Sequence, residues 1–336
     1  MEQEHHTEEF VDRDAPGDGR ETAGGSVPKS KSDDRILWAS GIMAIGLMLS
    51  TAIYAFVMKS PAEKGGTGGS SVAVQSPTSS LAALQEEVTP SEGVTLPVVW
   101  GDLGQQLSSA GVINDAQFRA LYADQGGQPP DMTQMLDGSS TGKITMTPQN
   151  AGIILNLLWA LGLGNKNPIL ENGPMENPQY GGAGNFASTG GWTLAVGNAM
   201  SHYDAHPFVT LTAEQQSLVG QVAQNIYRPC CGNSTYFPDC NHGMAMLALL
   251  ELMASQGATA DQMYKTALTV NSYWFPDTYM ILAEYFADRG TAWNAVDPKT
   301  VLGIAYSSAQ GYQRIVAQET QPAQGQQSGG ERCGTS

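Results

Sequence analysis

RPCCGNSTYFPDCNHGMAMLALLELM, residues 228–253, joins a cysteine-rich loop to an apolar segment. Within residues 243–254, Glu251 is the one charged side chain, and the other positions are Met, Ala, Leu and Gly. A helix that is apolar on nearly every face is buried in a protein core. We therefore predict a central core helix over residues 241–255, with Asp239 or Asn241 capping its first turn and Gly257 after its end.

Sulfur and nitrogen donors gather where this helix begins. The four donors within thirteen residues are Cys230, Cys231, Cys240 and His242, and Met244 adds a thioether just beyond them. Cys240 and His242 fall on the first helical turn, where free N–H groups and the positive end of the helix dipole favour a thiolate. We expect the loop before Cys240 to fold back over that turn.

Residues 36–58 form a run of 23 residues without charge or proline. As a helix, this run would reach about 34 Å, enough to span the hydrocarbon core of a bilayer. Trp38 and Tyr54 stand near its ends, as interfacial aromatic residues do. Three basic residues flank the run on its N-terminal side and two on the other, so the positive-inside rule places the N-terminus in the cytoplasm. The sequence thus predicts a single-pass protein of the cell membrane with an extracytoplasmic C-terminal domain.

Composition divides the rest of the chain. Residues 1–35 are acidic and poor in large apolar groups, and residues 318–336 are polar and rich in Gln and Gly, so we expect both to be disordered. Residues 59–95, rich in Gly, Ser, Thr and Pro, are expected to form a flexible linker. Residues 96–317 are predicted to form one extracytoplasmic helical domain, so the fold class is all-α with long glycine-rich loops.

Recurring helix-start signals support the all-α class. Three segments have the capping-box form, in which Thr or Asn is followed three residues later by Gln. They are Asn114/Gln117, Thr212/Gln215 and Thr259/Gln262. Besides the central helix, the expected helices span residues 102–110, 115–124, 148–163, 213–227, 260–272, 277–289 and 298–316. Strand-like alternation is scarce.

Charge and loop composition bear on partners. Residues 65–336 carry 21 acidic and nine basic side chains, which argues against nucleic acid as a partner of this part. Residues 165–192 form a long segment rich in glycine, and such loops in compact domains often have a function. We expect this segment to wrap the core or to cover the cysteine site, in preference to acting as a ligand-binding lid. In the alternative interpretation of the protein as a scaffold, it is the contact surface for a protein partner. Nothing in the sequence indicates an oligomeric state.

The cysteine cluster has three chemical interpretations. In the first, Cys230, Cys231, Cys240 and His242 bind zinc as three thiolates and one imidazole, or a subset of them with Met244 binds copper(I). In the second, Cys240 forms a disulfide with Cys230 or Cys231, and the remaining thiol can meet Cys333. In the third, the cluster carries out thiol-disulfide exchange. The metal site ranks first and the redox site third.

Other catalytic patterns are missing from the sequence. It contains no Gly-x-Ser-x-Gly, His-Glu-x-x-His or phosphate-binding loop, so common hydrolase and kinase chemistries have no support. His202 and His206 have the spacing of two ligands on one helical turn, but Pro207 disfavours a helix at His206. We therefore interpret these histidines as surface or core residues.

The cysteine stretch has a local resemblance to two families over about forty of the 336 residues. Pro229 to Gly232 followed by Asp239, Cys240 and His242 resembles the Cys/His signature of bacterial membrane-anchored proteins named for a Pro-Cys-Tyr-Cys-Gly-Cys motif. Residues 250–263 are similar to the helical hairpin of cytochrome c maturation thiol proteins. Both families act outside the cytoplasm, and the second resemblance implies thiol reduction during haem attachment.

Overall fold

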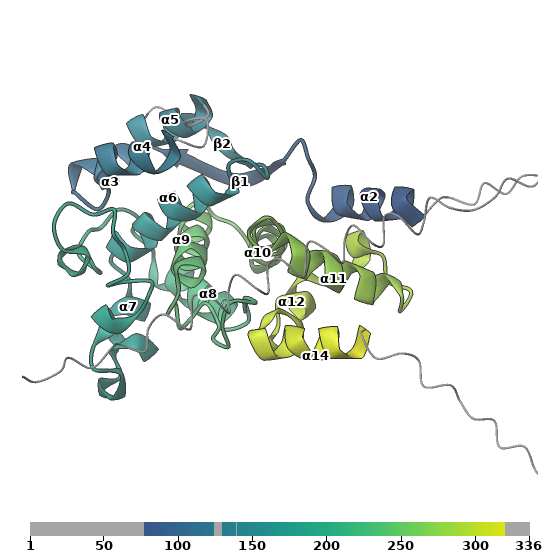
Figure 1. The fold of residues 1–336 in the computed structure, drawn as a ribbon. Coiled ribbons are helices and arrows are strands. Elements are labelled where there is room, and N and C mark those ends of the chain that lie inside the picture. The colour runs from purple at the N-terminus through teal and green to yellow at the C-terminus, as the bar shows by residue number, and fades with distance from the viewer. Residues whose placement is uncertain (1–76, 124–129, 139, 320–336) are drawn as a thin grey trace, which may run out of the picture. The chain divides into compact units, whose positions relative to one another are not determined.

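Helix α9 (Asn241–Ser255) is the centre of the fold. The computed structural model describes residues 77–123, 130–138 and 140–319, which belong to one compact unit, Ala73–Ser336. All positions from 243 to 254 are buried, because the segment is apolar on every face and has neighbours around it. Helices α6 (Ala151–Gly164) and α8 (Ala213–Ala223) pack along α9, and Figure 1 shows α6 and α9 side by side. The predicted core helix is confirmed with its bounds.

Further helices and one sheet lie around this centre (Figure 1). Short 3-10 turns lie between α7 and α8 and between α11 and α12. The remaining elements, in chain order, are α2 (Pro77–Val88), β1 (Val94–Gly101), α3 (Leu103–Ser109), α4 (Asp115–Ala123), α5 (Pro130–Asp137), β2 (Ser140–Met146), α7 (Pro168–Asn172), α10 (Ala260–Trp274), α11 (Pro276–Ala287), α12 (Pro298–Val301), α13 (Ile304–Ser307) and α14 (Ala309–Glu319). Helix α2 falls within the range that was expected to be a linker, and it packs against α11.

The expected all-α class is wrong, because β1 and β2 pair as an antiparallel sheet. Along β1, the buried residues Leu96, Val98 and Trp100 alternate with more exposed neighbours, as in a strand with one face on the core. Pro97 conceals this alternation, because a residue without an N–H is usually an argument against a strand. Here it lies in a register irregularity between Thr95 and Val99, where the ladder does not need its N–H.

The prediction of a single-pass membrane protein is corrected. Residues 36–58, on which it rested, lie outside the residues that the structure describes. Within the described ranges, no helix is long and apolar enough to cross a membrane. Helix α6 is apolar throughout much of its length, but it has 14 residues, and a membrane span needs about 20. We therefore do not carry forward the membrane anchor, the cell-membrane location or the extracytoplasmic placement of the domain.

Most helix-start signals are confirmed. The capping boxes of Thr212 at α8 and Thr259 at α10 make both reciprocal hydrogen bonds. Asn114 makes one of the two hydrogen bonds of its capping box, in which its side-chain oxygen accepts from the N–H of Gln117. Residues 298–316 do not form one helix, since extended backbone at Gly303 and Ser308 separates α12, α13 and α14.

The contact between α6 and α9 depends on a missing side chain. A Cβ added at Gly162 of α6 would collide with the carbonyl oxygen of Met244 on α9. Gly152 lies on the same helix and has open space where its Cβ would be. Of these two glycines, Gly162 therefore lies at the close contact between α6 and α9, and Gly152 does not.

Glu251 is the charged residue inside α9, and it is fully buried. Its carboxylate accepts hydrogen bonds from the Nδ2 groups of Asn165 (2.9 Å) and Asn167. Both amides are fixed in orientation, because their Oδ1 atoms accept from the backbone N–H of Val209 and Ile169. Burial raises the pKa of Glu251 to about 8, although the two amide hydrogen bonds oppose the shift.

We predict opposite effects of alanine at the two α6 glycines. Gly162→Ala should lower the free energy of unfolding by roughly 1–3 kcal/mol, because the added methyl overpacks the contact with α9. Gly152→Ala is the matched control and should raise it by roughly 0.5–1 kcal/mol, since alanine has the better helix propensity. Urea denaturation of both variants measures the difference. Equal effects at the two positions would contradict the close approach of α6 and α9.

Glu251 should make stability fall as pH rises. Its pKa is near 4.5 in the unfolded chain and about 8 in the folded one, so the folded chain holds an extra proton between these values. The contribution of the protonated Glu251 side chain to the free energy of unfolding is fully present below pH 4.5 and is lost as the pH rises through 8. Relative to Glu251→Gln, the free energy of unfolding should therefore decrease by about 1.4 kcal/mol per pH unit in this window. Urea titrations at several pH values test this, and a flat difference would show that the buried carboxylate is ionised.

Candidate metal centre

The loop that carries the cysteines is tied down by backbone hydrogen bonds. Thr235 donates from its N–H (2.8 Å) and its Oγ1 (3.1 Å) to the carbonyl of Ile226. Tyr227 N–H donates to the carbonyl of Leu302 (2.8 Å), and Ala309 N–H donates to the carbonyl of Cys231 (2.9 Å). The loop is thus joined to the segment that follows α8 and to the C-terminal segment that contains α12 and α14.

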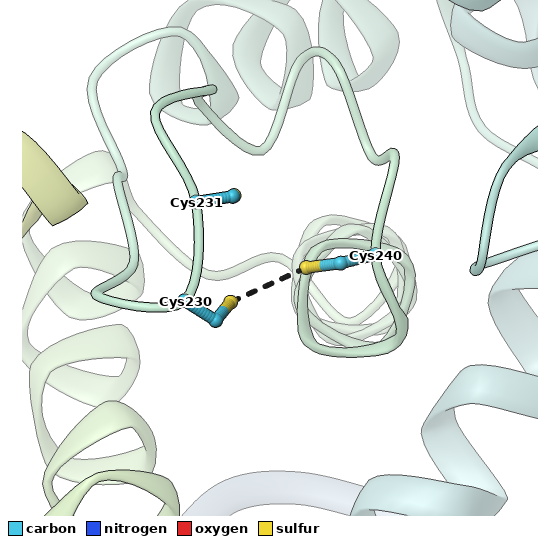
Figure 2. Close-up of side chains that lie close together, drawn as sticks. All are labelled: Cys230, Cys231 and Cys240. Atoms are coloured by element: carbon cyan, nitrogen blue, oxygen red, sulfur yellow. Dashed lines mark hydrogen bonds between the residues drawn. The ribbon is translucent and has the colours of Figure 1, made fainter. Parts of the chain in front are cut away.

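Three cysteines converge where this loop meets the start of α9. The Sγ atoms of Cys230, Cys231 and Cys240 all lie within 4.8 Å of one another. The Sγ atoms of Cys230 and Cys240 are 3.4 Å apart, and Figure 2 shows them facing each other between the loop and the helix end. Cys230 is exposed, and the other two are half-buried. A group of three thiols at this separation can hold a metal ion.

A buried arginine organises the loop from inside. The Arg228 side chain is only 1% exposed, and each of its nitrogens has an acceptor. Its Nη1 donates to the carbonyl of Asn233 (3.1 Å), and its Nη2 donates to the carbonyl of Phe237 (3.1 Å) and to Oδ1 of Asp239 (2.5 Å). Its Nε donates to the sulfur of Cys240 (2.9 Å). One guanidinium therefore fixes the course of the loop and one thiol of the cluster.

The guanidinium needs the space left by a glycine on the first turn of α9. A Cβ at Gly243 would collide with the Nη2 and Cζ atoms of Arg228. The backbone N–H of Gly243 also points at the sulfur of Cys240, which accepts it at 3.4 Å as the N-cap of α9. The cap is therefore Cys240, whereas Asp239 or Asn241 was expected. Asp239 instead pairs with Arg228 and accepts from Nδ2 of Asn233 (2.7 Å).

Hydrogen bonds make the three thiols unequal. The pKa of Cys240 is lowered, because hydrogen bonds with Cys230 and Cys231, together with His242 and Arg228, favour its thiolate against the cost of burial. The pKa of Cys230 is raised by its hydrogen bonds with Cys231 and Cys240 and by burial. The pKa of Cys231 is raised to about 11, since the bond with Cys230 lowers it less than the bond with Cys240 and burial together raise it. Hydrogen bonds and burial together therefore lower the pKa of Cys240 and raise those of the other two thiols.

His242 lies beside the cluster without belonging to it. The group whose ligand atoms all lie within 4.8 Å of one another contains the three cysteines and not His242. The imidazole packs against the rings of Phe275 (4.4 Å between centroids) and Trp274 (5.6 Å). Its Nδ1 is buried, and it has no hydrogen-bond partner among the described residues. A buried polar atom in this state is unusual and needs an explanation, such as a bound water or ion.

Met244, the fifth expected ligand, is placed in the core. It is fully buried, and its backbone and Cγ lie against Gly162 of α6. Met244 therefore belongs to the contact between α6 and α9, and its role as a ligand stays a prediction.

The disulfide interpretation remains a prediction. Cys230, Cys231 and Cys240 are free thiols, and Cys333 lies outside the described residues.

The glycine-rich segment, residues 165–192, lies against the cysteine loop, in agreement with the expectation that it covers the cysteine site. The N–H of Ser188 donates to the carbonyl of Asp239 (3.3 Å). The rings of Tyr180 and Phe186 contact that of Phe237, with centroids 5.4 and 5.5 Å apart. The segment is therefore a support for the loop. Its use as a contact surface for a protein partner stays a prediction.

His202 and His206 meet each other in a separate place. Nδ1 of His202 and Nε2 of His206 are 3.3 Å apart, and Nε2 of His202 lies 3.1 Å from the carbonyl of Val196. With that carbonyl as acceptor, His202 donates from Nε2, so His206 is the donor in the pair. The two histidines therefore hydrogen-bond to each other, in agreement with their interpretation as surface or core residues.

The cluster has no counterpart that would name its role: no family model, curated protein or solved structure matches this chain. The two family resemblances of the cysteine stretch therefore stay predictions. The residue that sequence reasoning missed is Arg228. Its one signal was an arginine directly before Pro-Cys-Cys in a segment otherwise poor in basic residues.

Removing the buried guanidinium should destabilise the protein and expose the thiols. Arg228→Met removes one hydrogen-bond donor from each of Asp239, the Cys240 sulfur and two backbone carbonyls and leaves the half-buried Asp239 carboxylate without its ion pair, so the free energy of unfolding should fall by roughly 3–5 kcal/mol. Arg289→Met is the matched control, because Arg289 is 45% exposed and its ion pair with Glu319 is worth about 1 kcal/mol or less. Denaturation and the rate of thiol labelling measure both effects. Similar losses in the two variants would refute the organising role of Arg228.

Proposed function

We propose that this protein binds a zinc ion through Cys230, Cys231 and Cys240 and exchanges it with its surroundings. The observation that carries the proposal is the convergence of three sulfur atoms within 4.8 Å of one another. In a tetrahedral zinc site, a Zn–S bond of ~2.3 Å separates two ligand sulfurs by about 3.8 Å. The 3.4 Å between Cys230 and Cys240 needs only a small adjustment to reach that value.

His242 supplies the fourth ligand in this proposal. Its buried Nδ1 lacks a partner among the described residues, and it stands two positions after Cys240 on the first turn of α9. A neutral imidazole nitrogen is a good zinc ligand, with a bond of ~2.0–2.1 Å. Rotation of the ring toward the cluster would give the nitrogen a partner and complete a site of three thiolates and one imidazole.

The charges near the cluster support thiolate ligands. Three thiolates around Zn²⁺ leave one net negative charge. The Arg228 guanidinium donates to Cys240 and lies within the same loop, so it offsets that charge at close range. A hydrogen bond to a ligand atom also orients that ligand, as outer-shell partners do in metal sites.

We infer exchangeable binding rather than a purely structural ion from how the loop is built. Arg228 and the backbone bonds of Thr235 and Ala309 already hold the loop without a metal. The domain also has a large apolar core of its own. Cys230, moreover, is exposed, so a bound ion stays accessible from solvent. Small zinc domains that unfold without the ion have neither a binding loop held by its own hydrogen bonds nor a large apolar core.

Copper(I) is the second candidate, and one observation favours it. The mutually close group consists of sulfur atoms alone, with His242 outside it. Soft thiolate ligands select copper(I), which does not require the imidazole. Under this alternative, His242→Ala leaves the metal content unchanged.

Metal analysis of the purified full chain, reduced and loaded with zinc, tests the proposal. We expect about one zinc per chain, lost in Cys230→Ser, Cys231→Ser and Cys240→Ser. His242→Ala should weaken affinity by at least the ~10-fold that loss of an outer-shell partner costs. His206→Ala is the matched control and should keep full occupancy. Circular dichroism before and after chelation should be alike, because the fold does not depend on the ion.

Two outcomes would overturn the proposal. Wild-type protein with no bound zinc and no bound copper(I) after loading excludes a metal site. Loss of the helical spectrum on chelation would show that a bound ion is structural and not exchangeable.

A further inference from the structure

Cys230 and Cys240 are arranged as a pair within the cluster. Their sulfur atoms are 3.4 Å apart, and Figure 2 shows them directed at each other. The sulfur of Cys240 accepts from Nε of Arg228 (2.9 Å) and from the N–H of Gly243 (3.4 Å). Because Cys240 is surrounded by donors, the S–H group in the pair belongs to Cys230. In this pair, the thiol of Cys230 faces the sulfur of Cys240, which accepts hydrogen bonds from its neighbours.

The third cysteine has other neighbours. The sulfur of Cys231 lies 3.7 Å from Oδ1 of Asp239 and 3.9 Å from the carbonyl of Asn233, both of which are acceptors. These oxygen contacts set Cys231 apart from the pair that Cys230 and Cys240 form at 3.4 Å. Exposure also separates the three thiols, since Cys230 is the exposed one. A reagent in solution thus meets Cys230 first, and Cys240 is the sulfur next to it.

We propose that Cys230 and Cys240 form a redox-reactive dithiol, which low-molecular-weight disulfides oxidise to a Cys230–Cys240 disulfide that expels the metal ion. The loss of metal rests on the proposed function, whereas the reactivity of the dithiol does not.

The oxidation proceeds in two exchange steps. Solvent takes the proton of the exposed Cys230 thiol, and the Cys230 thiolate attacks a disulfide RSSR, which forms a Cys230–SR bond and breaks the S–S bond of the reagent. The departing RS⁻ takes a proton from solvent and leaves as RSH. The Cys240 thiolate then attacks the sulfur of Cys230, forms the internal disulfide and releases a second RS⁻. Two thiol sulfurs are oxidised, and one RSSR is reduced to RSH and RS⁻.

The geometry makes the second step intramolecular and short. The two sulfurs must approach by about 1.4 Å to reach the length of a disulfide bond. Cys230 lies on the exposed part of the loop, so it can supply this movement while Cys240 stays fixed as the cap of α9.

The internal disulfide removes two of the three sulfur ligands. Cys231 then remains as the one thiol of the cluster. A single thiolate with His242 does not complete a four-coordinate zinc site, so the ion leaves. Reduction of the disulfide restores both ligands, and the oxidation state of the pair thereby controls metal binding.

Oxidised glutathione provides the test, on the full chain carrying Cys333→Ser so that three cysteines remain. The reduced, metal-free protein is treated with excess reagent, alkylated and mapped by mass spectrometry. We expect two of the three thiols to be lost and Cys230 to be linked to Cys240 without retained glutathione. Cys240→Ser should stop at a glutathione adduct on Cys230. Cys231→Ser, in this metal-free arm, should form the same linkage as its parent.

A zinc-loaded sample of the same protein completes the test. Zinc release, followed with a chromogenic chelator, should keep pace with the loss of two thiols, and dithiothreitol should restore binding. Linkage through Cys231, or free Cys230 and Cys240 after excess reagent in the metal-free protein, would overturn the inference. If the linkage forms but no zinc binds in the reduced state, the proposed function fails alone. If zinc binds but the linkage never forms, this inference fails alone.

Discussion

The buried guanidinium of Arg228 is the constraint on which the cysteine site depends. A buried charge without partners costs several kcal/mol, so the chain must bring acceptors to it. It does so by folding residues 228–240 around the side chain, with two carbonyls, Asp239 and the Cys240 sulfur as acceptors. The same requirement explains why position 243 is a glycine. The cluster of thiols is thus placed by a charge that is not itself a ligand.

Helix α9 connects this site to a second buried polar centre. Its N-terminal end meets Arg228, and further along the helix Glu251 meets the amides of Asn165 and Asn167. Between them the helix is packed on all sides by apolar residues. A rigid, fully enclosed helix is a firm base for the cap residue Cys240, while Cys230 comes from a loop with an exposed edge. This combination of one fixed and one accessible sulfur suits an ion that enters and leaves.

The sequence predicted the core helix with its bounds, the capping boxes of α8 and α10, and a cysteine cluster where the core helix begins. These features depend on local pattern and spacing. The sequence failed for the β1–β2 sheet, since Pro97 hides the alternation of the strand and the partner strand lies far along the chain. It also failed to separate α12, α13 and α14, whose ends are set by extended backbone at Gly303 and Ser308.

Among the candidate ligands, the sequence named the cysteines and His242 but had no means to sort them. The enclosure of Met244 against Gly162 and the packing of His242 against Trp274 and Phe275 are contacts between elements remote in sequence. The pairing of Cys230 with Cys240 depends on how the loop between them folds around Arg228. The sequence by itself determined that a helix apolar on every face must be buried and that cysteines stand at its first turn. Only the tertiary structure decided which sulfur is held and which is free to react, because that depends on where the guanidinium finds its acceptors.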